Sequence, residues 1–211
     1  MKNVRKLTLL CGLLTAVSLS VCAMPTTTTT WSQSEVKISG QPVASASINK
    51  ALAHYASEAR QNGEKIQAEA KSMQERSWSY EHNYTQKATY CSDQYISFLT
   101  EEYTYEGGPH GYTETRGLVF ATKTGEKVTL EQYLGRSRAE LRTLLGDIVR
   151  NDLDARNVMY FEDELPGALA TDAPYNYYLD QAGHAMLLFN QYEIAPYSSG
   201  LISIDVSSLR K

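Results

Sequence analysis

The feature that most limits the folds open to this chain is a change in the spacing of its apolar residues, which occurs twice. Between residues 48 and 59 they recur every three or four positions, which is typical of an amphipathic helix. Between residues 77 and 122 they alternate with polar residues, which is typical of half-buried strands. A helical stripe returns at residues 141–149, and three strands are expected after it, over residues 175–179, 184–189 and 201–206. Helices and strands in separate runs predict an α+β fold, with helices packed on antiparallel sheets.

The first half is expected to begin with a strand over residues 31–42. The helix that follows either ends near Gly63 or continues its stripe as far as residue 73. Three further strands are expected at residues 78–84, 95–105 and 116–122, with a turn between Tyr84 and Tyr90.

Two helix starts in the second half are marked by local side-chain patterns. Thr129 is followed three positions later by Gln132, and Ser137 by Glu140. A Ser or Thr with Gln or Glu at the third following position is typical of a capping box, which satisfies backbone N–H groups at a helix start. The sequence therefore predicts helices that begin directly after Thr129 and Ser137.

The N-terminal residues have the pattern of a secretory signal peptide. Three basic residues within positions 1–6 precede an uncharged apolar stretch at 7–21, and the small residue Ala23 follows. The apolar stretch, about 15 residues long, is shorter than the roughly 20 residues that a membrane-spanning helix needs. We therefore expect a signal peptide over residues 1–23, with an uncleaved anchor or a lipid anchor at Cys22 as alternatives.

Cleavage of this leader would change the charge and the cysteine content. The formal net charge of −4 would lose three positive charges and become −7. Cys11 and Cys22 would be removed, and the remaining Cys91 could form no internal disulfide, so the fold must depend on its packed core. The expected product is an extracytoplasmic protein of the periplasm or cell surface. Its acidic charge argues against a nucleic-acid partner, and no membrane span is expected after cleavage.

Four segments are expected along the chain. The leader at 1–23 precedes a threonine-rich linker at 24–30, because a polar tract without apolar residues cannot support a core. Two α+β domains are then expected at 31–118 and 119–211, packed closely together as two small subdomains.

Motifs for metal, cofactor or hydrolytic chemistry do not occur in this sequence. The four histidines lie in separate segments, without a His-x-x-x-His or Cys-x-x-Cys pair, so neither a metal site nor a cofactor is expected. There is no Gly-x-Ser-x-Gly elbow and no phosphate-binding loop. Cys91 is expected to be a half-buried structural thiol rather than a nucleophile.

Two segments have the composition of ordered binding loops. In the first, residues 103–111, three glycines and a proline lie within five positions and indicate a specific turn that can bring His110 close to a partner. The second, residues 190–200, places stiff tyrosine rings on a connecting loop, where they supply contact area at low entropic cost. The candidate binding residues are Tyr105, Gly107, Gly108, His110, Tyr192, Glu193, Pro196 and Tyr197.

These segments resemble a known family of extracytoplasmic domains. The pattern Tyr-x-Tyr-x-Gly-Gly-x-His-Gly at 103–111, and the run from residue 177 to the glycine at 200, resemble the RsiV-like family. Residues 31–118 are similar to the domain that precedes the catalytic domain in PdaC-type peptidoglycan deacetylases. Pro109 stands where that turn usually has alanine, and it should stiffen the turn further.

The resemblance implies a non-catalytic binding module of the bacterial cell envelope. The exported domain of RsiV binds lysozyme, so the implied partners are a basic protein such as lysozyme, or peptidoglycan. The catalytic domain of the PdaC-type enzymes does not occur within these residues. The alternative is a hydrolase that modifies cell-wall glycan, using His110 with a carboxylate or with Cys91.

Overall fold

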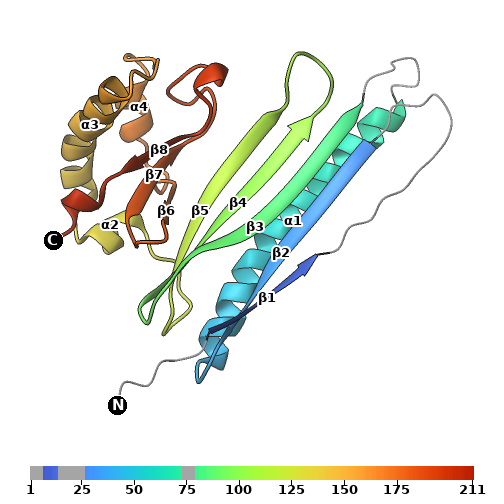
Figure 1. Cartoon of the computed structure of the whole chain (residues 1–211), viewed down its shortest axis with the longest axis horizontal. Helices are drawn as coiled ribbons and strands as arrows, with labels where there is room; N and C mark the ends of the chain where they lie inside the picture. Colours follow the sequence, from blue (N-terminus) through green and yellow to red (C-terminus); the bar gives the residue numbers. More distant parts are fainter. Residues whose placement is uncertain (1–6, 14–26, 73–78) are drawn as a thin grey trace. The chain divides into compact units, whose positions relative to one another are not determined.

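The computed structural model describes residues 7–13, 27–72 and 79–211 of the chain (Figure 1). Helices and two sheets make up these residues, which confirms the α+β class. The strands are β1 (Leu7–Leu13), β2 (Thr27–Ile38), β3 (Tyr80–Cys91), β4 (Tyr95–Tyr105), β5 (Tyr112–Ala121), β6 (Tyr177–Leu179), β7 (Ala185–Phe189) and β8 (Ile202–Asp205). The helices are α1 (Pro42–Ser72), α2 (Leu130–Leu134), α3 (Arg138–Ala155) and α4 (Leu165–Leu169), with short 3-10 turns at Tyr197–Ser199 and Ser207–Leu209.

The contacts divide the chain into two compact units. Unit 1 comprises residues 1–87, 100–114 and 122–126, and unit 2 comprises residues 88–99, 115–121 and 127–211. The strands β3, β4 and β5 each contribute residues to both units. The division therefore differs from the single boundary expected between residues 118 and 119.

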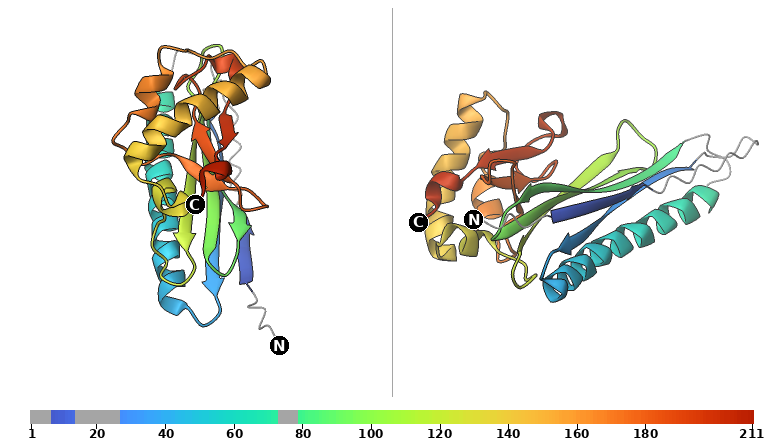
Figure 2. Two further views of the ribbon diagram at one scale, coloured as in Figure 1. Left: turned by 90° about the vertical axis from the view of Figure 1, so that its left-hand side faces the viewer. Right: turned by 60° about the horizontal axis from the view of Figure 1, so that its bottom comes forward.

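In unit 1 the long helix α1 packs along β2, as both views in Figure 2 show. The Asn49 amide links the two elements, since it accepts from Val36 N (2.7 Å) and donates to Val36 O (2.9 Å). The helix continues through Gly63, so the stripe does not end there. Its buried face consists of residues at the expected three-four spacing, Ala44, Ser45, Ile48, Leu52, Ala56, Ala59, Gly63, Ile66 and Ala70.

One strand pair in unit 1 is parallel, where the sequence predicted only antiparallel pairing. Strands β2 and β3 pair with Thr27 opposite Tyr80 and Trp31 opposite Tyr84. The helix α1 is the crossover that parallel strands require, because a short turn cannot return the chain to the same end of a sheet. The sheet order is β1-β2-β3-β4-β5.

The threonine tract is part of this pairing rather than a linker. Residues 27–30 form the first residues of β2 and lie opposite residues 80–83 of β3. Threonine is β-branched and favours strands, so the polar composition that suggested a linker is compatible with an exposed strand. The strand β3 is also continuous, so the turn expected between Tyr84 and Tyr90 is not formed.

The predicted leader falls mostly outside the described residues. Residues 1–6 and 14–26, which include Cys22 and Ala23, are outside them, and Leu7–Leu13 forms β1, antiparallel to β2. The signal peptide and the lipid anchor remain predictions. Among the described residues, no helix is both long and apolar enough to span a bilayer.

Unit 2 has its own core, to which all three of its helices contribute. In α3 the expected stripe is buried at Leu141, Leu145 and Val149 and continues to Leu153. The stripe packs in one cluster with residues of the three-stranded sheet, whose order is β6-β7-β8. The short helix α4, which was not predicted from the sequence, buries Leu165 and Leu169 in the same cluster.

Both predicted capping boxes are confirmed. At the start of α2 the Thr129 hydroxyl accepts from Gln132 N, and the Gln132 side chain accepts from Thr129 N (2.8 Å). At the start of α3 the Ser137 hydroxyl accepts from Glu140 N, and Glu140 Oε2 accepts from Ser137 N (2.8 Å). Each box satisfies N–H groups that the first helical turn would leave unpaired.

The second box predicts a specific dependence of stability on pH. Hydrogen bonds from Lys211 Nζ and from Ser137 lower the pKa of Glu140 from 4.5 to about 2. A carboxyl whose pKa is lower in the folded state stabilises the protein above its unfolded pKa, and this contribution is lost as the pH falls toward 2. We expect Glu140→Gln, which keeps the box but removes the charge, to lower the unfolding temperature at pH 6 and to match the unmodified chain near pH 2.

Thermal unfolding followed by circular dichroism between pH 2 and pH 7 would measure this difference. Glu126→Gln, which removes an exposed carboxylate from a turn in unit 1, is the matched control and should leave the pH profile unchanged. A Glu140→Gln difference that stays constant across this range would contradict the assignment.

Candidate functional site

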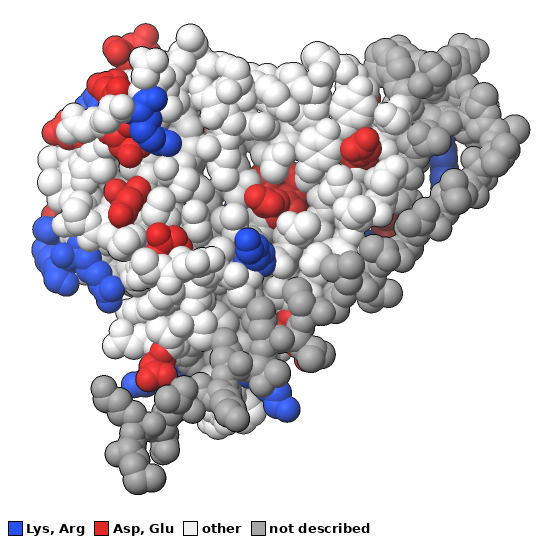
Figure 3. Space-filling view, viewed as in Figure 1, with Lys and Arg blue, Asp and Glu red and all other residues white. Residues whose placement is uncertain are grey.

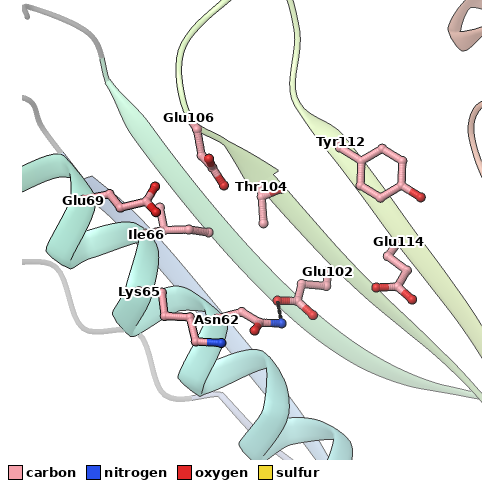
Figure 4. Close-up of a pocket in the computed structure, with 9 residues that line it drawn as sticks. All are labelled: Asn62, Lys65, Ile66, Glu69, Glu102, Thr104, Glu106, Tyr112 and Glu114. Carbon is pink, nitrogen blue, oxygen red and sulfur yellow. Dashed lines mark hydrogen bonds between the residues drawn. The ribbon is translucent and has the colours of Figure 1, made fainter.

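A groove of about 320 Å³ is formed within unit 1 by side chains of α1, β4 and β5 and by Glu106 just after β4 (Figure 4). Its lining contains four carboxylates and one ammonium group, together with the exposed ring of Tyr112, so it is an acidic surface with an aromatic element. The lining residues are Asn62, Lys65, Ile66, Glu69, Glu102, Thr104, Glu106, Tyr112 and Glu114.

Glu102, in the lining of this groove, is held by a buried histidine. His82 is only 1% exposed, and its Nε2 lies 3.0 Å from Glu102 Oε1. Asn62 Nδ2 donates to the same oxygen at 3.2 Å, and Figure 4 shows this bond. The second ring nitrogen, His82 Nδ1, is buried and has no hydrogen-bond partner among the described residues.

The position of His82 indicates that it holds the Glu102 carboxylate in place and does not act as a general base. Gly63 of α1 packs against the ring so closely that an added Cβ would lie 2.6 Å from Nδ1. One edge of the imidazole is therefore covered by the helix and the other is directed at Glu102. A base must reach the proton that it removes, which this enclosed ring cannot do in the observed conformation.

The glycine-rich segment forms the specific turn that its composition predicted. Gly107 and Gly108 have φ values of 90° and 110°, which favour glycine. The Tyr105 hydroxyl donates to Gly108 O at 2.9 Å, and His110 Nδ1 lies 3.0 Å from Gly111 O. The turn joins β4 to β5, and the groove is lined by its neighbours Glu106 and Tyr112 rather than by the four predicted residues. Their binding role stays a prediction.

The tyrosine-rich segment is an ordered loop in unit 2. Tyr192 has a positive φ of 66°, which is uncommon for a residue other than glycine, and its N–H donates to Ala195 O at 3.1 Å. Glu193 Oε2 accepts from Asn190 N at 2.8 Å, and desolvation raises the pKa of Glu193. Pro196 precedes the 3-10 turn, and the rings of Tyr192 and Tyr197 lie 6.0 Å apart. Buried Ile194 and Ala195 anchor this loop.

A second loop of unit 2 carries further exposed apolar side chains and is hydrogen bonded to the first. Phe161 N donates to Ile194 O at 2.7 Å, and Ser199 Oγ donates to Met159 O at 3.0 Å. Met159 is 71% exposed and Tyr192 52% exposed. We call the exposed apolar side chains of these two loops, together with Leu201 directly after the first loop, the apolar patch; its members are Met159, Phe161, Tyr192 and Leu201. Three exposed acidic residues, 162–164, directly follow Phe161.

Sequence reasoning identified only part of these two surfaces. Tyr192 was predicted as a contact residue, whereas Met159 and Phe161 were not, because isolated apolar residues in an acidic segment give no periodic signal. His82 was assigned only to an alternating strand. His82 alternates with Tyr80 and Tyr84, which are both buried, so the alternation could have identified it as a buried histidine.

Cys91, one of the residues named for the hydrolase alternative, has a different exposure from the one predicted. This thiol is exposed rather than half-buried, since it is the last residue of β3. Local desolvation and the Asp93 carboxylate raise its pKa, which disfavours the thiolate that a nucleophile needs. His82 lies beside the carboxylate of Glu102, and His184 lies 3.2 Å from that of Asp180.

On the face seen in Figure 3, lysine and arginine side chains form small separate groups rather than one broad basic surface. Nucleic-acid binding usually requires such a surface. Within the described part of the chain, no group of three or more His, Cys, Asp or Glu side chains could hold a metal ion.

Comparisons with known proteins match both halves of the chain. Residues 31–113 match the family described as "Deacetylase PdaC", and residues 135–208 match the family described as "Protein of unknown function (DUF3298)". No curated protein matches the chain in sequence.

Two crystal structures of DUF3298 family proteins have a similar fold. The protein from Bacteroides fragilis aligns over 97% of this chain and 92% of its own, with a TM-score of 0.67 and 19% identity. The protein from Pseudomonas aeruginosa aligns over 97% of this chain and 91% of its own, with a TM-score of 0.57 and 16% identity. At these identities the similarity establishes the fold alone.

Proposed function

We propose that this chain, in which a PdaC-like N-terminal half precedes a DUF3298 domain, is an exported, non-catalytic binding module of the bacterial cell envelope. The family matches support a cell-envelope-related role, since PdaC-like domains are typically extracytoplasmic. The proposed partner is a basic protein such as lysozyme, with cell-wall glycan as the alternative ligand. The observation that carries the proposal is the apolar patch of unit 2.

The construction of the patch supports a role in protein binding. Its side chains lie on two loops that are joined by one backbone hydrogen bond and by one from the Ser199 hydroxyl, so little conformational entropy would be lost on binding. Tyr192 and Tyr197 supply rigid, amphipathic rings, which are frequent in the energetically important centres of interfaces. A group of exposed apolar side chains rimmed by polar residues marks an interaction site more often than isolated ones do.

Charge supports a basic partner. The acidic residues 162–164 lie next to Phe161 of the patch, and the whole chain carries a formal charge of −4. Removal of the predicted leader would make this charge −7. Opposite charges around an apolar centre speed association and exclude like-charged partners.

Isothermal titration calorimetry of the purified chain with a basic c-type lysozyme would test the proposal. We expect binding at about 50 mM salt that weakens at about 300 mM, because rim charges are screened. Tyr192→Ala, which removes the exposed tyrosine of the patch, should weaken the affinity about tenfold, as is typical of a tyrosine at an interface centre. Val43→Ala is the control, since it removes an exposed apolar side chain of unit 1 that belongs neither to the patch nor to the groove, and it should leave the affinity unchanged.

Soluble peptidoglycan fragments form the second arm of this experiment. Binding of the fragments without lysozyme binding, if it is lost in Tyr192→Ala, would assign the patch to glycan. The absence of binding in both arms at low salt would overturn the proposed function.

A further inference from the structure

We propose that the groove of unit 1 is a binding site for a small organic polycation, a ligand whose ammonium groups are joined by short spacers. This site is separate in residues from the apolar patch and does not depend on the function proposed for it.

The charge of the groove favours such a ligand. The groove is lined by four carboxylates, which belong to α1, to β4, to the residue after β4 and to β5. The lining contains only one ammonium group, that of Lys65. Figure 4 shows the side chains of α1 extending toward the strands, so that acidic groups line both sides of the groove. Four carboxylates against one ammonium group give the groove a negative potential, which favours a cationic ligand.

Glu102 is oriented before any ligand arrives. The buried His82 and the Asn62 amide both hold its Oε1 atom, at 3.0 and 3.2 Å. The fold leaves His82 Nδ1 buried without a partner among the described residues, an unfavourable arrangement for a polar atom. The chain keeps the His82 ring although Nδ1 is unpaired within the described part of the structure, and the other nitrogen, Nε2, lies beside the Glu102 carboxylate. We infer that the role of the ring is to fix the position of Glu102 in the groove. A preformed carboxylate loses little entropy when it binds a cation.

The size and the remaining lining of the groove restrict the class of cation. A volume of about 320 Å³ is at the lower end of the range for small-molecule sites and exceeds what a single metal ion occupies. The described residues also lack a cluster that could coordinate a metal. The ring of Tyr112, which is 41% exposed, and the side chain of Ile66 offer surfaces for methylene groups or for the face of a sugar ring. Linear polyamines and oligosaccharides of glucosamine with free amines share this chemistry.

Calorimetric titration of the full chain with spermidine and with a glucosamine tetramer would test the proposal and distinguish the two sources. The N-acetylated tetramer is the matched probe, because it keeps the sugar scaffold and removes the charge. We expect at least one amine probe to bind and the acetylated tetramer not to bind. Binding of spermidine alone assigns a linear polyamine, and binding of the glucosamine tetramer alone assigns an amino sugar.

Charge-neutralising variants locate the site. Glu102→Gln is expected to weaken the affinity about tenfold, as the loss of a charge-assisted hydrogen bond does. Glu114→Gln, at the edge of the groove, is a second variant in case the first disturbs the fold, which circular dichroism would report. Asp163→Asn changes the net charge equally but lies in unit 2, and should leave the affinity unchanged.

Two results would overturn the proposal. One is that neither amine probe binds at low salt. The other is that Asp163→Asn weakens binding as much as the groove variants do, which would indicate unspecific attraction to an acidic protein.

Discussion

Gly117→Ala is expected to cost more than about 4 kcal/mol of stability and to prevent unit 2 from folding at 37 °C. A Cβ atom at Gly117 would lie 1.9 Å from the carbonyl oxygen of Tyr177 and 2.2 Å from its carbonyl carbon. Both are backbone atoms, which cannot rotate away as the end of a side chain can.

The backbone around Gly117 is also fixed by hydrogen bonds. Gly117 N donates to Asn176 Oδ1 at 2.8 Å, and Asn176 Nδ2 donates to Thr115 O at 2.7 Å. Separation of the two backbones to admit a methyl group would break these bonds and leave partly buried polar groups unpaired. Packing and hydrogen bonding therefore act in the same direction at this position.

Urea denaturation followed by circular dichroism would measure the loss. Gly167→Ala is the matched control, because no atom lies within 4 Å of the Cβ position at Gly167, and its stability should change by no more than about 1 kcal/mol. A Gly117→Ala chain with an unchanged denaturation midpoint would contradict the close approach of residues 117 and 177.

The elements predicted correctly from the sequence are those with local causes. Each capping box joins residues three positions apart, and the stripe of α3 needs only its own spacing, so both could be identified without a partner. The parallel pairing of β2 and β3 could not, because Thr27 and Tyr80 are separated by more than fifty positions and nothing in either segment specifies the other. The threonine tract was assigned to a linker for the same reason, since its strand partner lies far along the chain.

The candidate sites divide in the same way. Tyr192 and Tyr197 are close in sequence and were predicted together, and the structure places their rings 6.0 Å apart. The groove depends on Glu69, Glu102 and Glu114, which belong to three separate elements, and charged residues on exposed faces have no distinguishing pattern. His82 and Glu102 meet only because the strands that carry them belong to one sheet, which composition and periodicity do not specify.

Gly63→Ala is expected to destabilise the chain by about 1–3 kcal/mol, although alanine favours a helix more than glycine does. The new methyl group would lie 2.6 Å from His82 Nδ1 and 2.9 Å from Cε1. His82 cannot move aside freely, because it is 1% exposed and bonded to Glu102. Overpacking should therefore exceed the propensity gain of about 1 kcal/mol.

A second helical glycine and a double variant separate these two contributions. Gly146→Ala in α3 meets only the exposed Arg150 side chain, with Nη1 at 3.4 Å, so helix propensity should prevail and stabilise the chain by up to about 1 kcal/mol. When His82 is replaced by alanine, the obstacle at Gly63 is removed, and Gly63→Ala should become neutral or stabilising in that background. Denaturation midpoints of the four chains in this cycle would measure the reversal. If Gly63→Ala had the same effect with and without the His82 ring, the loss of stability would arise elsewhere in α1. The helix would then not fix the position of the His82 ring, and the ring could not orient Glu102 in the way described above.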